Sequence, residues 1–161
     1  LIPTTPPESA WTHVDADHWG PTPDGRHVLV VIDRLSRFPV VKIVKGTAAD
    51  ANIEAFDDMF STNGFPIEMK TDGGPPFNGS DSHSLRKYLK YSGIKLRVVE
   101  SADDPEANGL AESFMRKIRK TWQSALLKRE NPRPMLNRML RSYRGTIHRR
   151  ILERALEFIW F

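Results

Sequence analysis

The chain has 161 residues, enough for one domain with a buried core and too few for two comfortable domains. Hydrophobic residues make up 39% and charged residues 27%, close to the soluble globular average, which excludes wholesale disorder. The sequence has no Cys, which excludes disulfide scaffolds, thiol nucleophiles and Cys-based zinc sites. No apolar run approaches the roughly 20 residues of a membrane span, so we expect no membrane partner.

The net charge of +4 is modest, but its distribution along the chain is uneven. Residues 1–112 hold 11 basic and 17 acidic side chains, whereas residues 113–161 hold 13 basic and 3 acidic ones. An acidic first part followed by a strongly basic last part indicates a polyanionic partner for the last part.

The first half of the chain predicts a three-stranded meander and a helix. Residues 1–10 contain three prolines and are typical of an extended arm. Strands are predicted over 11–19, over the continuous apolar run 27–33, and over 38–44. Thr47 is predicted to cap a helix, which Gly64 ends.

The second half alternates strands with helices. We predict a strand over 67–71, a helix over 82–92 and a strand over 94–99. Asp104 is predicted to cap a long helix with an apolar stripe of Leu110, Phe114 and Ile118. Pro132 and Pro134 should break it, with a further helix over 135–143 and no element predicted beyond about 146. The order β-β-β-α-β-α-β-α-α predicts an α/β fold, a mixed five-stranded sheet flanked by helices.

Three carboxylates fall where such a sheet usually builds a site. Asp17 lies near the end of the first strand, Asp72 ends another strand and Glu112 lies early in the long helix. Converging carboxylates repel one another, and hard divalent cations relieve that repulsion by taking oxygen ligands. Spacing alone leaves solvated loop acids as an alternative. Asp15 shares a strand face with Asp17, but we expect it to be an edge or solvent acid.

Four separated motifs occur in an order that resembles the integrase catalytic core of retroviruses and LTR retrotransposons, most closely the Ty3/gypsy-type integrases. The motifs are Trp11…Asp17-His18-Trp19-Gly20-Pro21, residues 30–37 (VVIDRLSR), residues 71–77 (TDGGPPF) and residues 105–112 (PEANGLAE). Residues 143–148 (YRGTIH) are similar to the family's Tyr-Arg-x-Thr-Pro-His. The resemblance covers residues 11–148, which divides the chain into an arm (1–10), the core (11–148) and an atypical tail (149–161).

The resemblance implies an RNase H-like fold and a D,D,E polynucleotidyl transferase that performs DNA 3′-end processing and strand transfer. It implies two Mg²⁺ ions, with Mn²⁺ as an alternative metal. Asp17 would bridge both ions, Asp72 would hold one and Glu112 the other. We therefore expect these three carboxylates to meet within reach of shared cations.

A basic surface is predicted beside the carboxylates. Arg116, Arg119 and Lys120 share a helix face with Glu112 at i+4, i+7 and i+8, where they could bind phosphates. The resemblance implies that such residues contact DNA, while Asn108 either contacts substrate or caps the turn. It also implies a homo-oligomer and a nuclear location, although we find no targeting signal.

The chain departs from the family pattern at several positions. Gly73-Gly74 replaces the usual Asn-Gly after the second aspartate, Ile147 replaces a proline, and the tail is unlike the family. A non-catalytic, element-derived module that binds DNA or a protein partner is therefore an alternative function. A nuclease that cleaves RNA–DNA hybrids would share the fold and metals, but it would not predict the Pro-x-x-Asn-Gly-x-x-Glu helix start.

Overall fold

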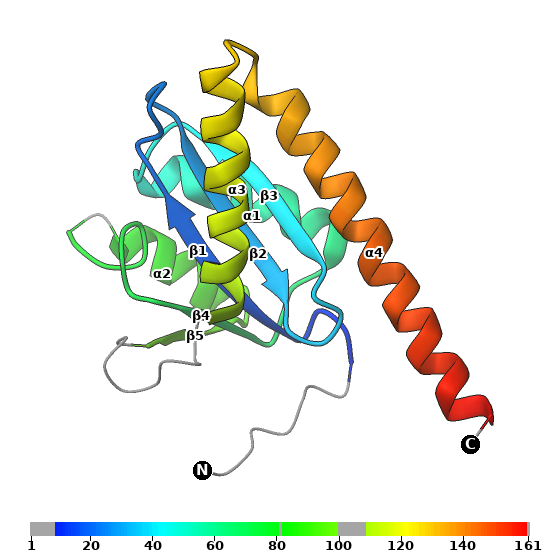
Figure 1. Cartoon of the computed structure of the whole chain (residues 1–161). Helices are drawn as coiled ribbons and strands as arrows, with labels where there is room; N and C mark the ends of the chain where they lie inside the picture. The colour runs from blue at the N-terminus through cyan, green and yellow to red at the C-terminus, as the bar shows by residue number, and fades with distance from the viewer. Residues whose placement is uncertain (1–8, 81, 100–108, 161) are drawn as a thin grey trace.

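The computed structural model describes residues 9–80, 82–99 and 109–160, with residues 147–160 as backbone alone. Within these residues, the strands and helices follow one another in the order predicted from the sequence (Figure 1). They are β1 His13–Trp19, β2 His27–Asp33, β3 Pro39–Val44, α1 Ala49–Asn63, β4 Glu68–Thr71, α2 Ser82–Tyr91, β5 Lys95–Val98, α3 Gly109–Leu127 and α4 Pro132–Trp160.

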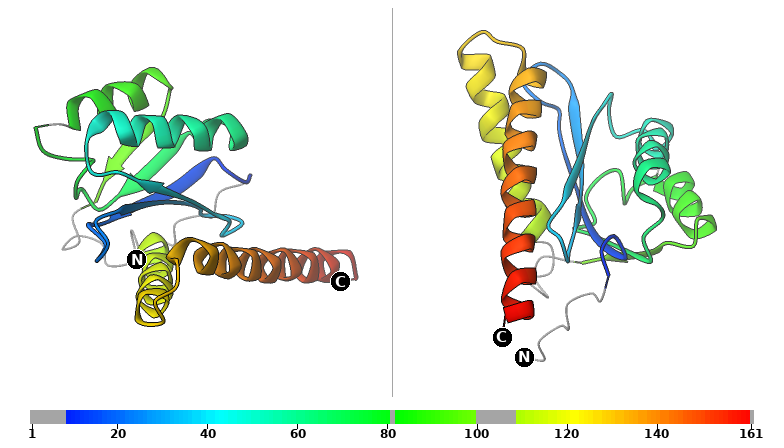
Figure 2. Two further views of the ribbon diagram at one scale, coloured as in Figure 1. Left: turned by 90° about the horizontal axis from the view of Figure 1, so that it is seen from above. Right: turned by 90° about the vertical axis from the view of Figure 1, so that its right-hand side faces the viewer.

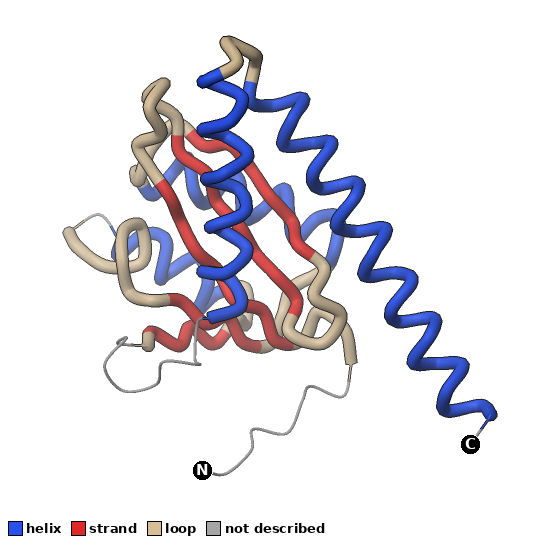
Figure 3. Tube along the Cα trace, in the orientation of Figure 1, coloured by secondary structure: helices blue, strands red, loops and turns tan. Residues whose placement is uncertain are grey.

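The strands form one mixed sheet with the order β3-β2-β1-β4-β5 (Figure 3). β1, β2 and β3 are antiparallel neighbours, which confirms the predicted meander. β4 is parallel to both β1 and β5, and helices connect β3 to β4 and β4 to β5. The carboxyl ends of β1, β4 and β5 therefore lie along the same edge of the sheet.

Helices cover both faces of the sheet, so the molecule has three layers (Figure 2). α1 and α2 pack on one face, and α3 and α4 pack on the other. β2 contributes to both cores: Leu29 and Val31 pack on the α1 side, and Val28, Val30 and Ile32 on the α3 side. This two-sided burial explains why the sequence of β2 is continuously apolar rather than alternating.

The two ends of α1 test the capping predictions. The predicted cap at Thr47 is wrong: the helix has Ala48 at its N-cap and no side-chain cap bond. Asn52 donates from Nδ2 to the carbonyls of Gly46 and Ala48 at 3.0 and 2.9 Å, which ties α1 to the loop before it. Gly64 ends the helix as predicted, with φ +86° and its N–H donating to the Phe60 carbonyl.

The connection between α3 and α4 differs from the prediction. α4 begins at Pro132, not at residue 135, because a proline is tolerated in the first turn, where no helical acceptor is available for an N–H. Arg129 follows α3 with φ +55°, so no glycine marks this turn. α4 continues through Trp160, where the sequence predicted no element, and its later part extends beyond the sheet in Figures 1 and 2. The predicted cap Asp104 lies outside the described residues.

Two neighbouring residues of α4 anchor that helix to the rest of the molecule. The Tyr143 ring lies edge-on to Phe114 of α3, with ring centroids 4.8 Å apart. The Arg144 guanidinium donates from Nε and Nη2 to the Pro39 carbonyl at 3.2 and 2.7 Å, and lies over the Phe38 ring. These contacts give the Tyr-Arg pair of the motif at 143–148 a packing role. Across the described part of the chain, no helix combines the length and apolarity that a membrane span requires.

Candidate active site

The parallel pairing of β1 and β4 places Asp17 and Asp72 at corresponding positions. Val14 pairs with Met69 and Asp15 with Lys70, so the same register, continued by two residues, brings Asp17 level with Asp72. Neighbouring strands in a sheet lie about 4.8 Å apart. Two aspartates distant in sequence therefore sit side by side at the carboxyl ends of adjacent parallel strands.

Glu112 lies on α3, the helix that covers the face to which Asp17 points. Asp17 pairs with Val30, and directly paired residues point to the same face of the sheet. Val30 belongs to the core under α3, so Asp17 points toward that helix, which carries Glu112 in its first turn. Asp17 is only 5% exposed, whereas the side chains of Asp72 and Glu112 are exposed.

Both of the other carboxylates affect the pKa of Asp17. Burial, followed by the charge of Asp72 and, as a smaller contribution, the charge of Glu112, raises the pKa of Asp17 to about 6. The His18 backbone N–H, which donates to Asp17 Oδ1 at 2.8 Å, and the positive charge of Arg119 oppose this shift. The site therefore concentrates negative charge, the condition that a bound cation relieves.

A tight glycine loop orients Asp72. The Gly74 N–H donates to Asp72 Oδ1 at 3.1 Å. Gly73 has φ +75°, and a Cβ at that position would lie 2.6 Å from Cγ1 of Val98 on β5. The loop thus needs glycine at 73 both for its backbone conformation and for its close approach to β5.

The donor set suits a hard divalent cation, because all three candidate ligands are carboxylate oxygens. However, over residues 9–80, 82–99 and 109–160, no group of three or more His, Asp or Glu side chains is close enough to hold a metal ion. The expected meeting of the three carboxylates is thus incomplete in this conformation. Asp17 is fixed by burial, so closing the site would require the exposed Asp72 and Glu112 side chains to turn toward it.

Asp15, two residues before Asp17, is paired with an arginine. Arg34 donates from Nε to Asp15 Oδ1 at 2.6 Å, and its Nη2 lies 3.5 Å from Oε1 of Glu68. Asp15 is 3% exposed, so the expectation of an edge or solvent acid is wrong. Its charge is balanced inside the protein, because Arg34 extends over it from the turn after β2. A sequence signal existed in the Asp-Arg pair that ends β2, but nothing in the sequence pairs it with residue 15.

The predicted basic residues are placed on the exposed side of α3. Arg116, Arg119 and Lys120 are all exposed. Arg119 lies over the ring of Trp19, with its guanidinium carbon 5.7 Å from the ring centroid. Asn108 lies outside the described residues. The sequence interpretation did not connect Trp19 with Arg119, although Trp19 lies two positions after Asp17 on the same strand face.

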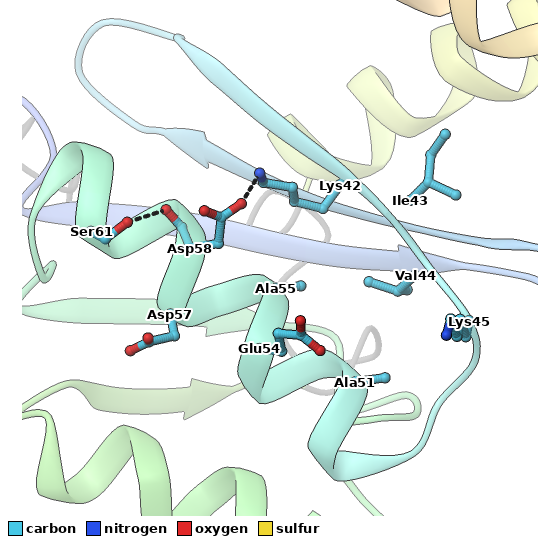
Figure 4. Close-up of a pocket in the computed structure, with 10 residues that line it drawn as sticks. All are labelled: Lys42, Ile43, Val44, Lys45, Ala51, Glu54, Ala55, Asp57, Asp58 and Ser61. Carbon is cyan, nitrogen blue, oxygen red and sulfur yellow. Dashed lines mark hydrogen bonds and ion pairs between the residues drawn. The ribbon is translucent and has the colours of Figure 1, made fainter.

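A separate groove lies on the far side of the sheet, between β3 and α1 (Figure 4). Lys42 bridges the groove by pairing with Asp58. None of the predicted site residues lines this groove; its lining residues are Lys42, Ile43, Val44, Lys45, Ala51, Glu54, Ala55, Asp57, Asp58 and Ser61. The carboxylate cluster and this groove are therefore distinct features on opposite faces.

Comparisons with known proteins agree with this architecture. No protein-family model matches the chain. The chain is 29% identical over 151 residues to a Caenorhabditis elegans protein described as "Uncharacterized protein K02A2.6", an alignment that covers 92% of this chain and 12% of that protein.

A solved structure resembles the fold. It is a chain of the simian T-cell lymphotropic virus intasome in complex with the PP2A regulatory subunit B56 gamma, similar with a TM-score of 0.65 at 15% identity over 81% of this chain and 47% of that chain. The present chain thus spans less than half of the viral chain and a small part of the curated relative. The likeness confirms the predicted RNase H-like α/β fold, which this chain shares with a chain of a retroviral intasome.

Proposed function

We propose that this chain is the catalytic core of a metal-dependent polynucleotidyl transferase that processes DNA 3′ ends and joins them to a second DNA. Asp17, Asp72 and Glu112 would be its metal ligands, for two Mg²⁺ ions or for Mn²⁺ in their place. The observation that carries the proposal is the parallel pairing of β1 with β4, which brings Asp17 and Asp72 to the same edge of the sheet, on the face covered by α3 with Glu112 in its first turn. Besides burial, the charges of Asp72 and Glu112 both raise the pKa of Asp17, so three acids from different elements interact electrostatically.

The cations, when bound, would activate the attacking oxygen and stabilise the leaving oxygen of an in-line displacement at phosphorus. The three carboxylates would hold the cations in different ways. Asp17 supplies a rigid carboxylate, because it is buried and its Oδ1 accepts from the His18 N–H. Asp72 and Glu112 supply exposed carboxylates that can close on an arriving cation. No covalent enzyme intermediate is needed, which suits a chain without cysteine.

The DNA would lie along α3. Arg116, Arg119 and Lys120 present their charges within two turns beyond Glu112, where they would bind the phosphates that flank the scissile bond. A homo-oligomer that acts on DNA in the nucleus fits this reaction. The similar viral chain is part of an intasome, which supports an assembly of this kind.

The direct test is an oligonucleotide joining and disintegration assay in Mg²⁺ or Mn²⁺. We expect product from the wild-type chain, and none above the EDTA background from Asp17→Asn or Glu112→Gln. Asp50→Asn is the matched control, because Asp50 is an exposed acid on α1, on the opposite face of the sheet. Equal product from Glu112→Gln and the wild type, or no metal-dependent product at all, would reject the proposal.

A non-catalytic DNA-binding module is the second candidate. It is favoured by the lack of a ready three-ligand metal group within the described ranges. This function predicts DNA binding that weakens with salt, without any metal-dependent product, and binding that is unchanged by Glu112→Gln. The same assays therefore separate the two functions.

A further inference from the structure

Trp19 ends β1 in a setting that fixes its ring. It lies two residues after Asp17 and so points to the same face, toward α3. Its ring packs edge-on against Trp122, with centroids 6.1 Å apart and planes at 88°. Trp122 is fully buried, donates from Nε1 to Asp24 Oδ1 at 3.0 Å, and has the Arg26 guanidinium over its ring at 5.0 Å. The half-buried Trp19 therefore rests on a rigid support.

Arg119 is held over this ring near the carboxylates. Its guanidinium carbon lies 5.7 Å from the Trp19 ring centroid, and its charge lowers the pKa of Asp17. None of the ion pairs among the described residues involves Arg119. The Arg119 guanidinium is thus held on the ring of Trp19, and its charge remains available to an anionic ligand.

The other two basic candidates on α3 have no such support. Neither Arg116 nor Lys120 lies over an aromatic ring in the described part of the molecule. A restrained guanidinium loses less side-chain freedom on binding a phosphate than an unsupported one. Arg119 is therefore the residue of the three whose geometry is set before the ligand arrives.

We propose that Trp19 is a positioning residue, which holds the Arg119 guanidinium ready to bind a backbone phosphate of DNA beside Asp17. The inference rests on the proposed function, since it takes DNA as the ligand of this face. Trp19 itself would not contact the DNA; it would act by holding Arg119, which does. The exposed face of Arg119 would contact the phosphate, while its other face stays on the indole ring.

A double-mutant cycle with Trp19→Leu and Arg119→Gln tests this coupling. Binding of a short fluorescein-labelled DNA duplex is measured in EDTA over a series of salt concentrations. We expect Trp19→Leu to weaken binding by about two- to fivefold, the usual range for an exposed cation–π contact. Because the charge remains, its salt dependence should match that of the wild type. Arg119→Gln should reduce the salt slope by about 0.9, equivalent to one phosphate contact.

The decisive result is the double variant. If Trp19 acts through Arg119, adding Trp19→Leu to Arg119→Gln should cause no further loss of affinity. Trp19→Phe, which keeps an aromatic face, should retain most of the wild-type affinity and controls for damage to the packing around Trp122. Additive losses in the double variant, or equal losses in the Phe and Leu variants, would overturn the inference.

The outcomes distinguish this inference from the proposed function. If the wild-type chain joins oligonucleotides but the affinity losses of Trp19→Leu and Arg119→Gln are additive, the proposed function stands and the positioning by Trp19 is rejected. A wild-type chain that binds the duplex with a coupled cycle, but forms no product, retains the positioning and rejects the catalysis. A wild-type chain that binds no duplex rejects both.

Discussion

Arg34 and Asp15 form an ion pair on one face of the sheet, with Arg34 Nε 2.6 Å from Asp15 Oδ1. Asp15 lies two residues before the candidate ligand Asp17, on the same face of β1. The two aspartates are therefore electrostatically different. Asp15 is paired with the Arg34 guanidinium, but burial has the larger effect and raises its pKa above the ordinary value, whereas the guanidinium lowers it by less. Asp17 has the carboxylates of Asp72 and Glu112 as neighbours.

Removing the partner of Asp15 should destabilise the fold. Arg34→Met leaves Asp15 buried without its ion pair, and we expect the free energy of unfolding to fall by about 3 kcal/mol, measured by urea denaturation at pH 7. Arg97→Met, at an exposed position of β5, is the control and should change stability little. Equal stability of the two variants would show that Arg34 does not balance Asp15.

Replacing Asp17 should stabilise the protein at neutral pH. The pKa of Asp17 in the folded protein is about 6, above its ordinary value of 3.8. Ionisation is thus harder in the folded state, so this group costs nothing below about pH 4 and lowers stability as the pH rises through 6. The full cost is about 3 kcal/mol at pH 7 and above. Asn keeps the acceptor for the His18 N–H but cannot ionise.

The measurement is urea denaturation of Asp17→Asn and of the wild type from pH 4 to pH 8 without divalent cations. The gain in stability of the variant should be small near pH 4 and largest above pH 6. Asp50→Asn should show no such trend, because Asp50 is exposed. A gain that is independent of pH would contradict the raised pKa. Mg²⁺ should raise the Tm of the wild type and leave that of Asp17→Asn unchanged.

The glycine after Asp72 should tolerate no side chain. Gly73 and Gly93 both have φ +75°, but only at Gly73 would a Cβ meet a neighbour, Val98 Cγ1 at 2.6 Å. We expect Gly93→Ala to cost about 1 kcal/mol through backbone strain and Gly73→Ala clearly more, as measured by denaturation. Combining Gly73→Ala with Val98→Ala should remove the excess. If the excess persists, the contact with Val98 is not its cause.

Arg144 should stabilise the edge of the sheet. Arg144→Met removes both hydrogen bonds to the Pro39 carbonyl and the stacking on Phe38, and we expect a loss of about 1–2 kcal/mol. Hydrogen exchange of the β3 amides should accelerate in this variant. Arg141→Met, one turn earlier and exposed, should leave exchange of β3 unchanged. Unchanged protection in both variants would mean that Arg144 does not anchor β3.

The order of the elements could be predicted because local patterns dominate it. The apolar run of β2, the glycine at 64 and the alternation of strands and helices each depend on neighbouring residues. The start of α4 could not, because Pro132 and Pro134 suit either a break or the first turn of a helix. The cap of α1 could not be predicted from residue type alone: Thr47 has a favoured capping side chain, yet α1 begins after Ala48 without a side-chain cap bond.

The candidate site was predictable in its residues more than in its surroundings. Asp17 and Asp72 were predicted from their places at strand ends together with the resemblance of the motifs, and the parallel register places them at corresponding positions. The partner of Asp15 and the support under Arg119 depend on contacts between residues far apart in sequence, namely Arg34 with Asp15 and Trp19 with Arg119. Such contacts have no local signal, so they needed the three-dimensional arrangement.

The arginine bond to Pro39 has a consequence for solubility. β3 is an outer strand of the sheet, and outer strands offer unpaired backbone groups to which a foreign strand can add. Proline has no N–H to offer, and its carbonyl is already taken by Arg144. The start of β3 is thereby closed to edge-to-edge aggregation by two residues that lie 105 positions apart in the chain.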